Sequence, residues 1–513
     1  MTMSLGIDFG TTRTVVALGI DGRYVLAHFD VDGEYHDFVP SMVALHDGER
    51  HYGWDAAHLL RSGQAQAALR SIKRLLADTP PDAHLEELGG VCVLDLLAEF
   101  LAALRAALAT SNLAEHLDFD QPLCATVALP ANSTTQQRYT TLEAFRRAGF
   151  CVELVLNEPT AAAIEFAHQD RSTLSPRSPK RYMVVYDLGG GTFDTSAISL
   201  QGQRFELLDS EGIARLGGDD FDEVIYDGCL EATERSPQSI SALLRERLLE
   251  LCRDAKEALR PQSKKLLIDL GEVIDGAEPV GLDVKELFER CQPLMDRTLA
   301  LIDRLFDGLI RFGIDPESVR ELGGLYLVGG GVSFPIVSRT LRERYGRKLK
   351  LAPQPHASTA VGLAIAGDPA AGVHVREAVT RHFGVWREVE GGAQKRFDPI
   401  FSKGDRSGED GVLEVKRAYR AVHNLGHLRF LECSDLDPDG QPQGDLMPWG
   451  ALLFPYAREL QGADGLDAVE VVPLSGAAPE IEERYRYHRD GRVSVEVRAL
   501  GTGFVVERWV GSF

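Results

Sequence analysis

The apolar and polar positions of this 513-residue chain follow two patterns that change near residue 377. Before that point, short strand-like apolar runs alternate with helical runs such as 94–109 and 133–148. After it, short alternating segments such as 412–415 and 492–497 predominate. Helices are also expected at 54–76, 219–260, 283–313 and 357–366, and further C-terminal strands at 470–472, 484–487 and 504–509. The pattern predicts an α/β part followed by a smaller β-rich domain.

One motif occurs twice in the α/β part: an apolar strand ends in aspartate, turns on glycine and continues as a threonine-containing strand. It spans Leu5–Thr12 (LGIDFGTT) and Val185–Asp194 (VYDLGGGTFD). Glycine lets backbone amides approach phosphate oxygens, and threonine hydroxyls add donors. Asp8 and Asp187 would repel phosphate and are better suited to hold Mg²⁺ through its waters. Two such hairpins predict a nucleotide held between two related lobes, and hence an ATPase.

Composition and charge indicate which partners and which cellular compartment to expect for this chain. With 44% hydrophobic and 26% charged residues, the chain is typical of soluble globular proteins, and its length predicts two or more domains. A net charge of −22 argues against binding to nucleic acid. The seven cysteines form no CxxC pair, which favours free thiols and a cytoplasmic location. The most apolar helical stretch is interrupted by Asp95, Glu99 and Arg105, so no membrane contact is expected.

Both turns and their surroundings resemble the heat shock protein 70 (DnaK) family of chaperones within the actin-like ATPase superfamily. The likeness covers about residues 4–367 and depends on motifs that stand in the family's order. These motifs are GIDFGTT (6–12), SIKRL (71–75), LNEPTAAAIEFA (156–167), VVYDLGGGTFDTS (184–196), RLGGDDFD (215–222) and LVGGG (327–331).

The resemblance implies an α/β fold with a two-lobed actin-like (ribonuclease-H-like) ATPase domain over 1–370. Its lobes would span about 1–180 and 181–370. A short linker at 371–378 would lead to a β-sandwich-like substrate-binding domain over 379–513 that lacks the family's helical lid.

The same resemblance implies ATP or ADP with Mg²⁺ as cofactors and assigns the site residues. The catalytic positions are Lys73, Glu158, Thr192 and Asp194, with Lys73 on a helix and directed at the γ-phosphate. Asp8 and Asp187 hold the metal through waters. The nucleotide positions are Gly10, Thr11, Thr12, Gly189, Gly190, Gly191, Thr192, Gly217, Gly218, Lys256, Gly329, Gly330 and Gly331. The alternatives are a solvated helix lysine for Lys73 and a helix-start carboxylate for Glu158.

The nucleoside end of the expected site departs from the family. Arg253 stands where a ribose-contacting glutamate is usual, and Glu257 stands at the next contact position. Ser333 replaces an arginine that lies over adenine in many members, and His356 replaces a common aspartate. Loss of an arginine–adenine stack predicts weaker or less adenine-selective binding.

The linker and the co-chaperone surface also differ from the family pattern. Residues 372–377 contain two branched apolar residues, so we expect weak docking of the linker on the ATPase domain. Leu154 and Asn132 replace an arginine and a tyrosine often used with J-domain co-chaperones, which speaks against that partner. The favoured function is ATP-dependent control of a polypeptide client; the alternatives are a nucleotide-gated scaffold with little turnover and, less favoured, a small-molecule (sugar) kinase.

Overall fold

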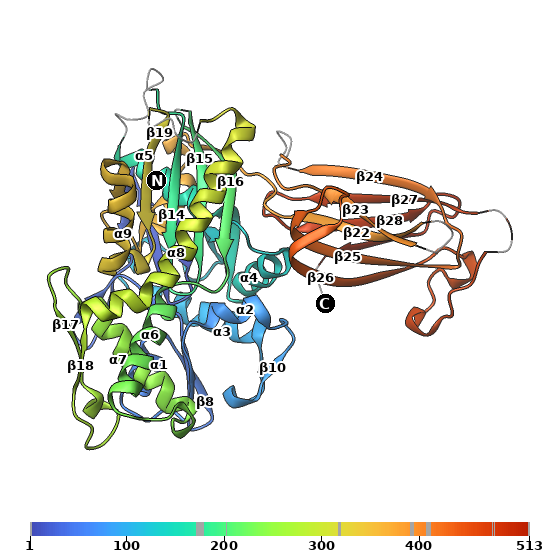
Figure 1. The fold of residues 1–513 in the computed structure, drawn as a ribbon. Coiled ribbons are helices and arrows are strands. Elements are labelled where there is room, and N and C mark those ends of the chain that lie inside the picture. The colour runs from blue at the N-terminus through green and yellow to red at the C-terminus, as the bar shows by residue number, and fades with distance from the viewer. Residues whose placement is uncertain are drawn as a thin grey trace. The chain divides into compact units, whose positions relative to one another are not determined.

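The computed structural model divides the chain into two compact units, shown in Figure 1. The first contains Met1–Ala131 and Thr140–Val375, and the second contains Asn132–Tyr139 and Arg376–Phe513. The structure describes residues 3–170, 179–201, 203–315, 320–389, 394–406, 412–474, 476 and 478–510. The expected lobe boundary near residue 180 adjoins residues 171–178, which lie outside this description.

Two sheets with the same strand order form the first unit. In each, three antiparallel strands occupy one side, and two further strands continue parallel to the first of them. The first sheet runs β13 (Phe150–Asn157), β12 (Leu123–Leu129), β1 (Met3–Phe9), β2 (Arg13–Ile20) and β3 (Arg23–Leu26), with β6 (Val39–Pro40) beside β2. The second runs β20 (Leu349–Leu351), β19 (Leu322–Val328), β14 (Tyr182–Leu188), β15 (Phe193–Gln201), β16 (Arg204–Ile213) and β21 (His374–Arg376). The repeated motif of the sequence therefore begins two copies of one topology.

The central strand β14 is buried on both faces. Tyr182, Val184 and Tyr186 join the core that includes α8 (Val284–Leu309). Met183 and Val185 join a separate core with α5 (Glu158–Gln169). Because successive side chains of a strand point to opposite faces, α8 and α5 cover opposite faces of this sheet.

Two helices connect the lobes at their centre. α5 follows the first sheet but packs on β14, β15 and β16 of the second. α10 (Ser358–Ala366) follows the second sheet but packs on β1, β2 and β12 of the first. A Cβ at Gly362 would lie 1.8 Å from the Ala161 carbonyl oxygen, so glycine is required where these helices approach each other.

Smaller elements extend both lobes. Those of residues 29–147 are β4 (Phe29–Val31), β5 (Glu34–His36), β7 (Val43–His46), β8 (Glu49–Tyr52), α1 (Gly53–Arg61), β9 (Ala67–Leu69), α2 (Leu75–Asp78), β10 (His84–Leu85), β11 (Val91–Cys92), α3 (Val93–Leu108) and α4 (Thr135–Arg147). Those of the second lobe are α6 (Gly218–Ala232), α7 (Ala242–Ala258), β17 (Lys265–Ile268), β18 (Val280–Asp283) and α9 (Pro335–Tyr345). No helix in the described part of the chain is long and apolar enough to cross a membrane.

One expected helix is wrong in extent. The helix predicted over 54–76 ends at Arg61, because Gly63 takes a left-handed φ of +74° and the chain then enters β9. The helices predicted across 219–260 are α6 and α7, and Pro237 begins a separate 3₁₀ turn between them.

The second unit contains two four-stranded antiparallel sheets with one shared core. One runs β23 (Gln394–Phe401), β22 (His382–Val389), β25 (Leu425–Leu436) and β26 (Pro442–Pro455); the other runs β24 (Leu413–Arg420), β27 (Glu480–Tyr487), β28 (Val493–Ala499) and β29 (Val505–Trp509). Phe383 and Phe430 of one sheet meet Tyr485 of the other in that core. The strand expected at 470–472 is wrong: Val472 exchanges hydrogen bonds with Asn424 instead of joining a ladder.

Candidate functional site

A cavity of about 250 Å³ lies where the glycine turns of the two sheets meet. Most of the predicted site residues line it, namely Asp8, Gly10, Thr11, Thr12, Lys73, Glu158, Asp187, Gly189, Gly190, Thr192, Gly218, Lys256, Gly329, Gly330 and Gly331. Gly191, Asp194 and Gly217 do not line it. A Cβ at Gly217 would lie 2.5 Å from the Gly190 carbonyl oxygen, and Asp194 pairs with Asp187 across β14 and β15. The structure therefore brings all three next to residues that do line the cavity.

The two turns have matching geometry. Residues 10–13 connect the paired Phe9 and Thr14, and residues 189–192 connect the paired Leu188 and Phe193. A Cβ at Gly190 would lie 2.1 Å from Cγ2 of Thr12, so the turns touch and only glycine leaves room. Residues of both turns consequently line one cavity, an arrangement suited to phosphate binding.

Lys73 lies in a 3₁₀ turn, η1 (Ile72–Arg74), and not in the longer helix that we expected. Only 8% of its side chain is exposed, and Nζ donates a hydrogen bond of 2.9 Å to Oε1 of Glu158. The alternative of a solvated surface lysine is therefore wrong. Glu158 is the first residue of α5, directly after β13, so the helix-start position and the contact with Lys73 are both present.

Negative charge accumulates at the bottom of the cavity. Burial, followed by the nearby Glu158 carboxylate, raises the pKa of Asp8 to about 7, while Lys73 opposes the shift. Burial, Glu158, Asp194 and Asp8 raise the pKa of Asp187 well above its usual value. Four carboxylates thus share the positive charge of Lys73, and a divalent cation would stabilise their ionised forms. No three such side chains in the described part of the chain converge to hold a metal ion directly, so these carboxylates fit Mg²⁺ through its waters.

An ion pair that the sequence did not reveal joins two residues of the cavity lining, one from each lobe. Arg13, which directly follows the first GTT motif, lies 2.5 Å from Oε2 of Glu257 and 4.4 Å from the centre of the Phe38 ring. His356 pairs with Asp37 at 2.9 Å. Lysines and arginines are common at surfaces, so nothing in the pattern distinguished Arg13 from a solvated residue.

Lys256 lines the cavity but is held by protein groups. Its Nζ donates to the Gly218 carbonyl oxygen at 2.6 Å and lies 2.6 Å from Oδ1 of Asp222. Arg253, the residue that departs from the family pattern, lines the same side. The predicted nucleoside contacts are therefore close to the cavity, although their charges are partly engaged by neighbouring carboxylates.

Comparisons with known proteins agree with this architecture. A family model described as Hsp70 protein matches residues 94–382. A chaperone protein HscA homolog from Polynucleobacter asymbioticus is 32% identical over 98% of this chain and 77% of its own length. The chain belongs to the Hsp70 family of chaperones. Chaperone protein HscA homologs from Herminiimonas arsenicoxydans and Cupriavidus necator are 29% and 31% identical over the same shares of both chains.

The mixed α/β architecture of the first unit fits the actin-like ATPase fold of the Hsp70 family. The linker region of this family member behaves differently from our expectation of weak docking. His374–Arg376 forms β21 at the edge of the second sheet, and the His374 amide donates to the Gln203 carbonyl oxygen at 2.9 Å. Strand addition uses backbone groups, so it does not need the apolar side chains that this linker lacks.

Proposed function

We propose that this Hsp70-family chaperone hydrolyses ATP in the cavity between its lobes and thereby controls binding of a polypeptide client by its β-rich second unit. The observation that supports ATP hydrolysis best is the buried Lys73–Glu158 pair, which lines the cavity together with both glycine turns. It combines a cation for developing phosphate charge with a carboxylate for the attacking water.

The proposed roles follow the chemistry of each group. The backbone amides and hydroxyls of Thr11, Thr12 and Thr192 bind phosphate oxygens. Lys73 stabilises charge that develops on the γ-phosphate, and Glu158 and Asp194 orient water. Asp8 and Asp187 would hold Mg²⁺ through its waters, and the ion would supply positive charge to neutralise phosphate oxygens.

Steady-state ATP hydrolysis by the full chain tests this proposal. We expect slow Mg²⁺-dependent turnover that an unfolded polypeptide increases and that Lys73→Ala reduces at least 100-fold. Lys285→Ala, at an exposed lysine of α8, is the matched control and should leave turnover unchanged. A second series with an added J-domain protein tests whether such a protein increases turnover. Turnover that persists in Lys73→Ala would contradict the proposal.

The Arg13–Glu257 pair favours one alternative, a scaffold that binds nucleotide with little turnover. Such a pair occupies the nucleoside end and competes with ligand contacts. The scaffold predicts a stable nucleotide complex, turnover that does not depend on Lys73 and no effect of a client polypeptide. The same experiment therefore distinguishes the two functions.

A further inference from the structure

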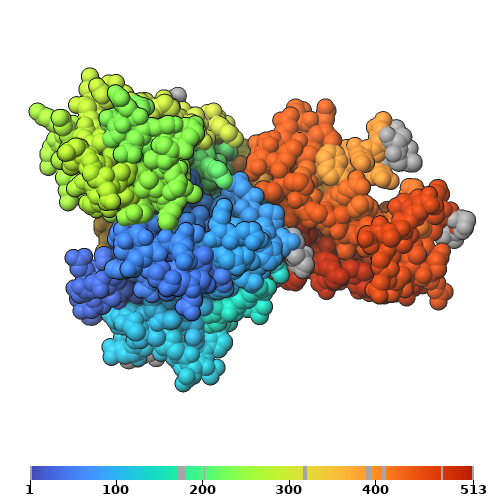
Figure 2. All heavy atoms as spheres, turned by 90° about the horizontal axis from the view of Figure 1, so that it is seen from below, coloured from blue at the N-terminus to red at the C-terminus, as the bar shows by residue number. Residues whose placement is uncertain are grey.

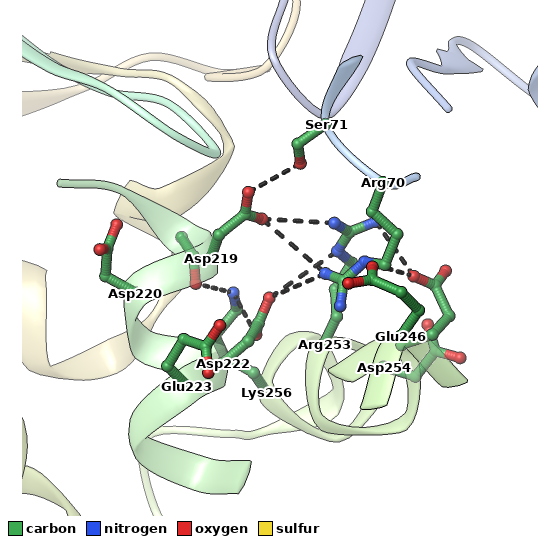
Figure 3. Close-up of polar contacts among 12 residues, drawn as sticks. Arg70, Ser71, Asp219, Asp220, Asp222, Glu223, Glu246, Arg253, Asp254 and Lys256 are labelled. Atoms are coloured by element: carbon green, nitrogen blue, oxygen red, sulfur yellow. Dashed lines mark hydrogen bonds and ion pairs between the residues drawn. The ribbon is translucent and has the colours of Figure 1, made fainter. Parts of the chain in front are cut away.

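Six charged side chains, buried or nearly so, meet between the two lobes beside the cavity (Figure 3). Arg70 comes from the segment between β9 and η1 in the first lobe. The other five come from α6 and α7 in the second lobe. We call Arg70, Asp219, Asp222, Glu250, Arg253 and Lys256 the inter-lobe cluster. Its three cations and three carboxylates balance in formal charge.

The two arginines of the inter-lobe cluster contact the same three carboxylates. Arg70 lies 3.8 Å from Asp219, 3.3 Å from Asp222 and 3.2 Å from Glu250. Arg253 lies 3.3, 3.8 and 3.2 Å from the same residues. Arg70 is 5% exposed and Arg253 is 12% exposed. A guanidinium from each lobe therefore shares one buried set of acceptors, where water screens the charges weakly.

The pKa values of the two α6 carboxyls depend on these cations. Burial raises the pKa of Asp219, but Arg253, Arg70 and Arg74 outweigh burial and hold it below its usual value. For Asp222, burial outweighs Lys256, Arg70 and Arg253, so its pKa is raised. Removal of Arg70 would thus leave fewer positive charges to offset the burial of the Asp222 carboxylate.

The inter-lobe cluster is connected to Lys73 through the chain. Arg70 precedes Lys73 by three residues, and between them Ser71 adopts a left-handed φ of +59° and donates through Oγ to Asp219 at 2.7 Å. On the other side, Arg74 donates to Asp220 at 2.9 Å and to the Gly191 carbonyl oxygen at 3.3 Å. Both flanks of Lys73 are therefore bonded to the second lobe.

We propose that Arg70 and Arg253 act together as positioning residues that fix the Lys73 turn of the first lobe to α6 and α7 of the second. This inference depends on the proposed ATPase function for its kinetic consequence. Because these inter-lobe contacts are made between protein groups, we also expect the lobes to stay together without nucleotide. Figure 2 shows atoms of the first lobe (blue) directly against atoms of the second (green), in agreement with the contacts of α7 with α1 and β9.

The proposal also explains the departure at position 253. A glutamate there, as is usual in the family, would give the cluster four carboxylates against two cations. Arg253 restores the balance and places a second guanidinium on the acceptors of Arg70. Its guanidinium is therefore engaged in joining the lobes and is not free to contact ribose.

Arg61 offers a matched control because it joins the same two lobes at the surface. It is 48% exposed and lies 3.3 Å from Glu250 and 3.4 Å from Asp254. Because the Arg61 side chain is half exposed, water screens its attraction to the buried Glu250 and the exposed Asp254, and we expect the contribution to be small. Arg61→Met therefore removes an additional inter-lobe contact of Glu250, while Arg70 and Arg253 both remain on that carboxylate.

The experiment compares the full wild-type chain with Arg70→Met, Arg70→Lys and Arg61→Met. In the absence of nucleotide, hydrogen exchange of residues 70–78 should be at least tenfold faster in Arg70→Met than in wild type. With ATP, kcat should fall at least tenfold, whereas the dissociation constant of ATP should change less than threefold. Arg70→Lys should give an exchange rate and a kcat between those of Arg70→Met and wild type, since lysine retains the charge but not the forked geometry. Arg61→Met should have the same exchange rate, kcat and ATP dissociation constant as wild type.

If Arg70→Met does not fold, the double variant Arg70→Met/Asp222→Asn keeps the remaining charges balanced and takes its place. Exchange that is unchanged in the Arg70 variants, or equally fast in Arg61→Met, would overturn the proposal. If wild type does not hydrolyse ATP, the ATPase proposal fails, whereas the exchange comparison without nucleotide still decides whether Arg70 holds the Lys73 turn.

Discussion

Lys73 Nζ and Glu158 Oε1 lie 2.9 Å apart, although the two residues are separated by 85 positions in the chain. Lys73 lies in a 3₁₀ turn, and Glu158 begins a helix that follows the edge strand β13. Each side chain is about a tenth exposed. The pair therefore places one cation and one carboxylate at fixed positions in the cavity.

Lys73 and Glu158 should act as a unit in ATP hydrolysis. We expect Lys73→Ala and Glu158→Gln each to lower kcat about 100-fold, and the double variant to lower it little further, because groups that act together are not additive. Steady-state hydrolysis measures this. The exposed pair Lys285 and Glu289, substituted in the same way, is the control. A double variant whose loss equals the product of the single losses would contradict a shared role.

Nucleoside selectivity should respond to Ser333, an exposed residue that lines the cavity beside Phe334. Ser333→Arg supplies a guanidinium that can stack on adenine, worth about 1–2 kcal/mol. We expect ATP to bind about 5 to 30 times more tightly, as measured by titration calorimetry against GTP as a reference. Thr340→Arg on α9, which does not line the cavity, is the control. Unchanged ATP affinity in Ser333→Arg would show that the base lies elsewhere.

Glu165 should make stability depend on pH. It is 3% exposed and accepts a hydrogen bond of 2.5 Å from Tyr326 Oη; burial raises its pKa from 4.5 to about 7, against the hydrogen bonds of Tyr326 and Ser358. The folded state therefore keeps a proton that the unfolded state releases. The contribution of protonated Glu165 to the free energy of unfolding is fully present below pH 4.5. It is lost as the pH rises to about 7, a decrease of roughly 3 kcal/mol.

Urea unfolding of wild type and Glu165→Gln between pH 4.5 and 8 checks this expectation. The difference in unfolding free energy between the two proteins should follow the decrease described above and become constant above pH 7. Glu343→Gln, at a carboxylate that is 69% exposed, should show no such trend. A difference that stays flat across the whole range would mean that Glu165 titrates normally.

Glu483 should be essential to the stability of the second unit. It is fully buried, lies 2.7 Å from Nη2 of Arg387 on the other sheet, and accepts hydrogen bonds from Tyr419 and Tyr485 at 2.6 and 2.7 Å. Glu483→Ala removes the buried acceptor of both tyrosine hydroxyls and leaves Arg387 with Asp398 as its remaining carboxylate, a loss that we expect to cost about 3–5 kcal/mol. Thermal and urea unfolding report this loss.

The same strand provides a comparison for Glu483. Glu480 pairs with Arg420 at 3.0 Å, but both side chains are more than half exposed. Glu480→Ala should therefore change the free energy of unfolding by less than about 1 kcal/mol. Equal effects of the two substitutions would show that burial does not decide the contribution of these ion pairs.

The sequence by itself determined the features that depend on local pattern. Strand–glycine–strand motifs predicted two related lobes, and the structure has two sheets with matching strand order. Most of the predicted site residues line one cavity because the backbone of a tight glycine turn leaves few alternatives. Local pattern was less informative at helix ends. The run 54–76 has helical periodicity, yet Gly63 stops the helix and η1 carries Lys73 instead.

Tertiary structure alone decided which distant charges meet. Arg70 reaches Asp222 across 152 positions and Arg13 reaches Glu257 across 244, and neither arginine differs in local pattern from a solvated one. Such pairs form where the lobes meet, since α7 of the second lobe packs against α1 and β9 of the first. Whether a charge is buried depends on what packs over it, and that is a property of the folded chain and not of its neighbours in sequence. The chemistry of the glycine turns was therefore present in the sequence, whereas the charges that hold the lobes around them appeared only in the fold.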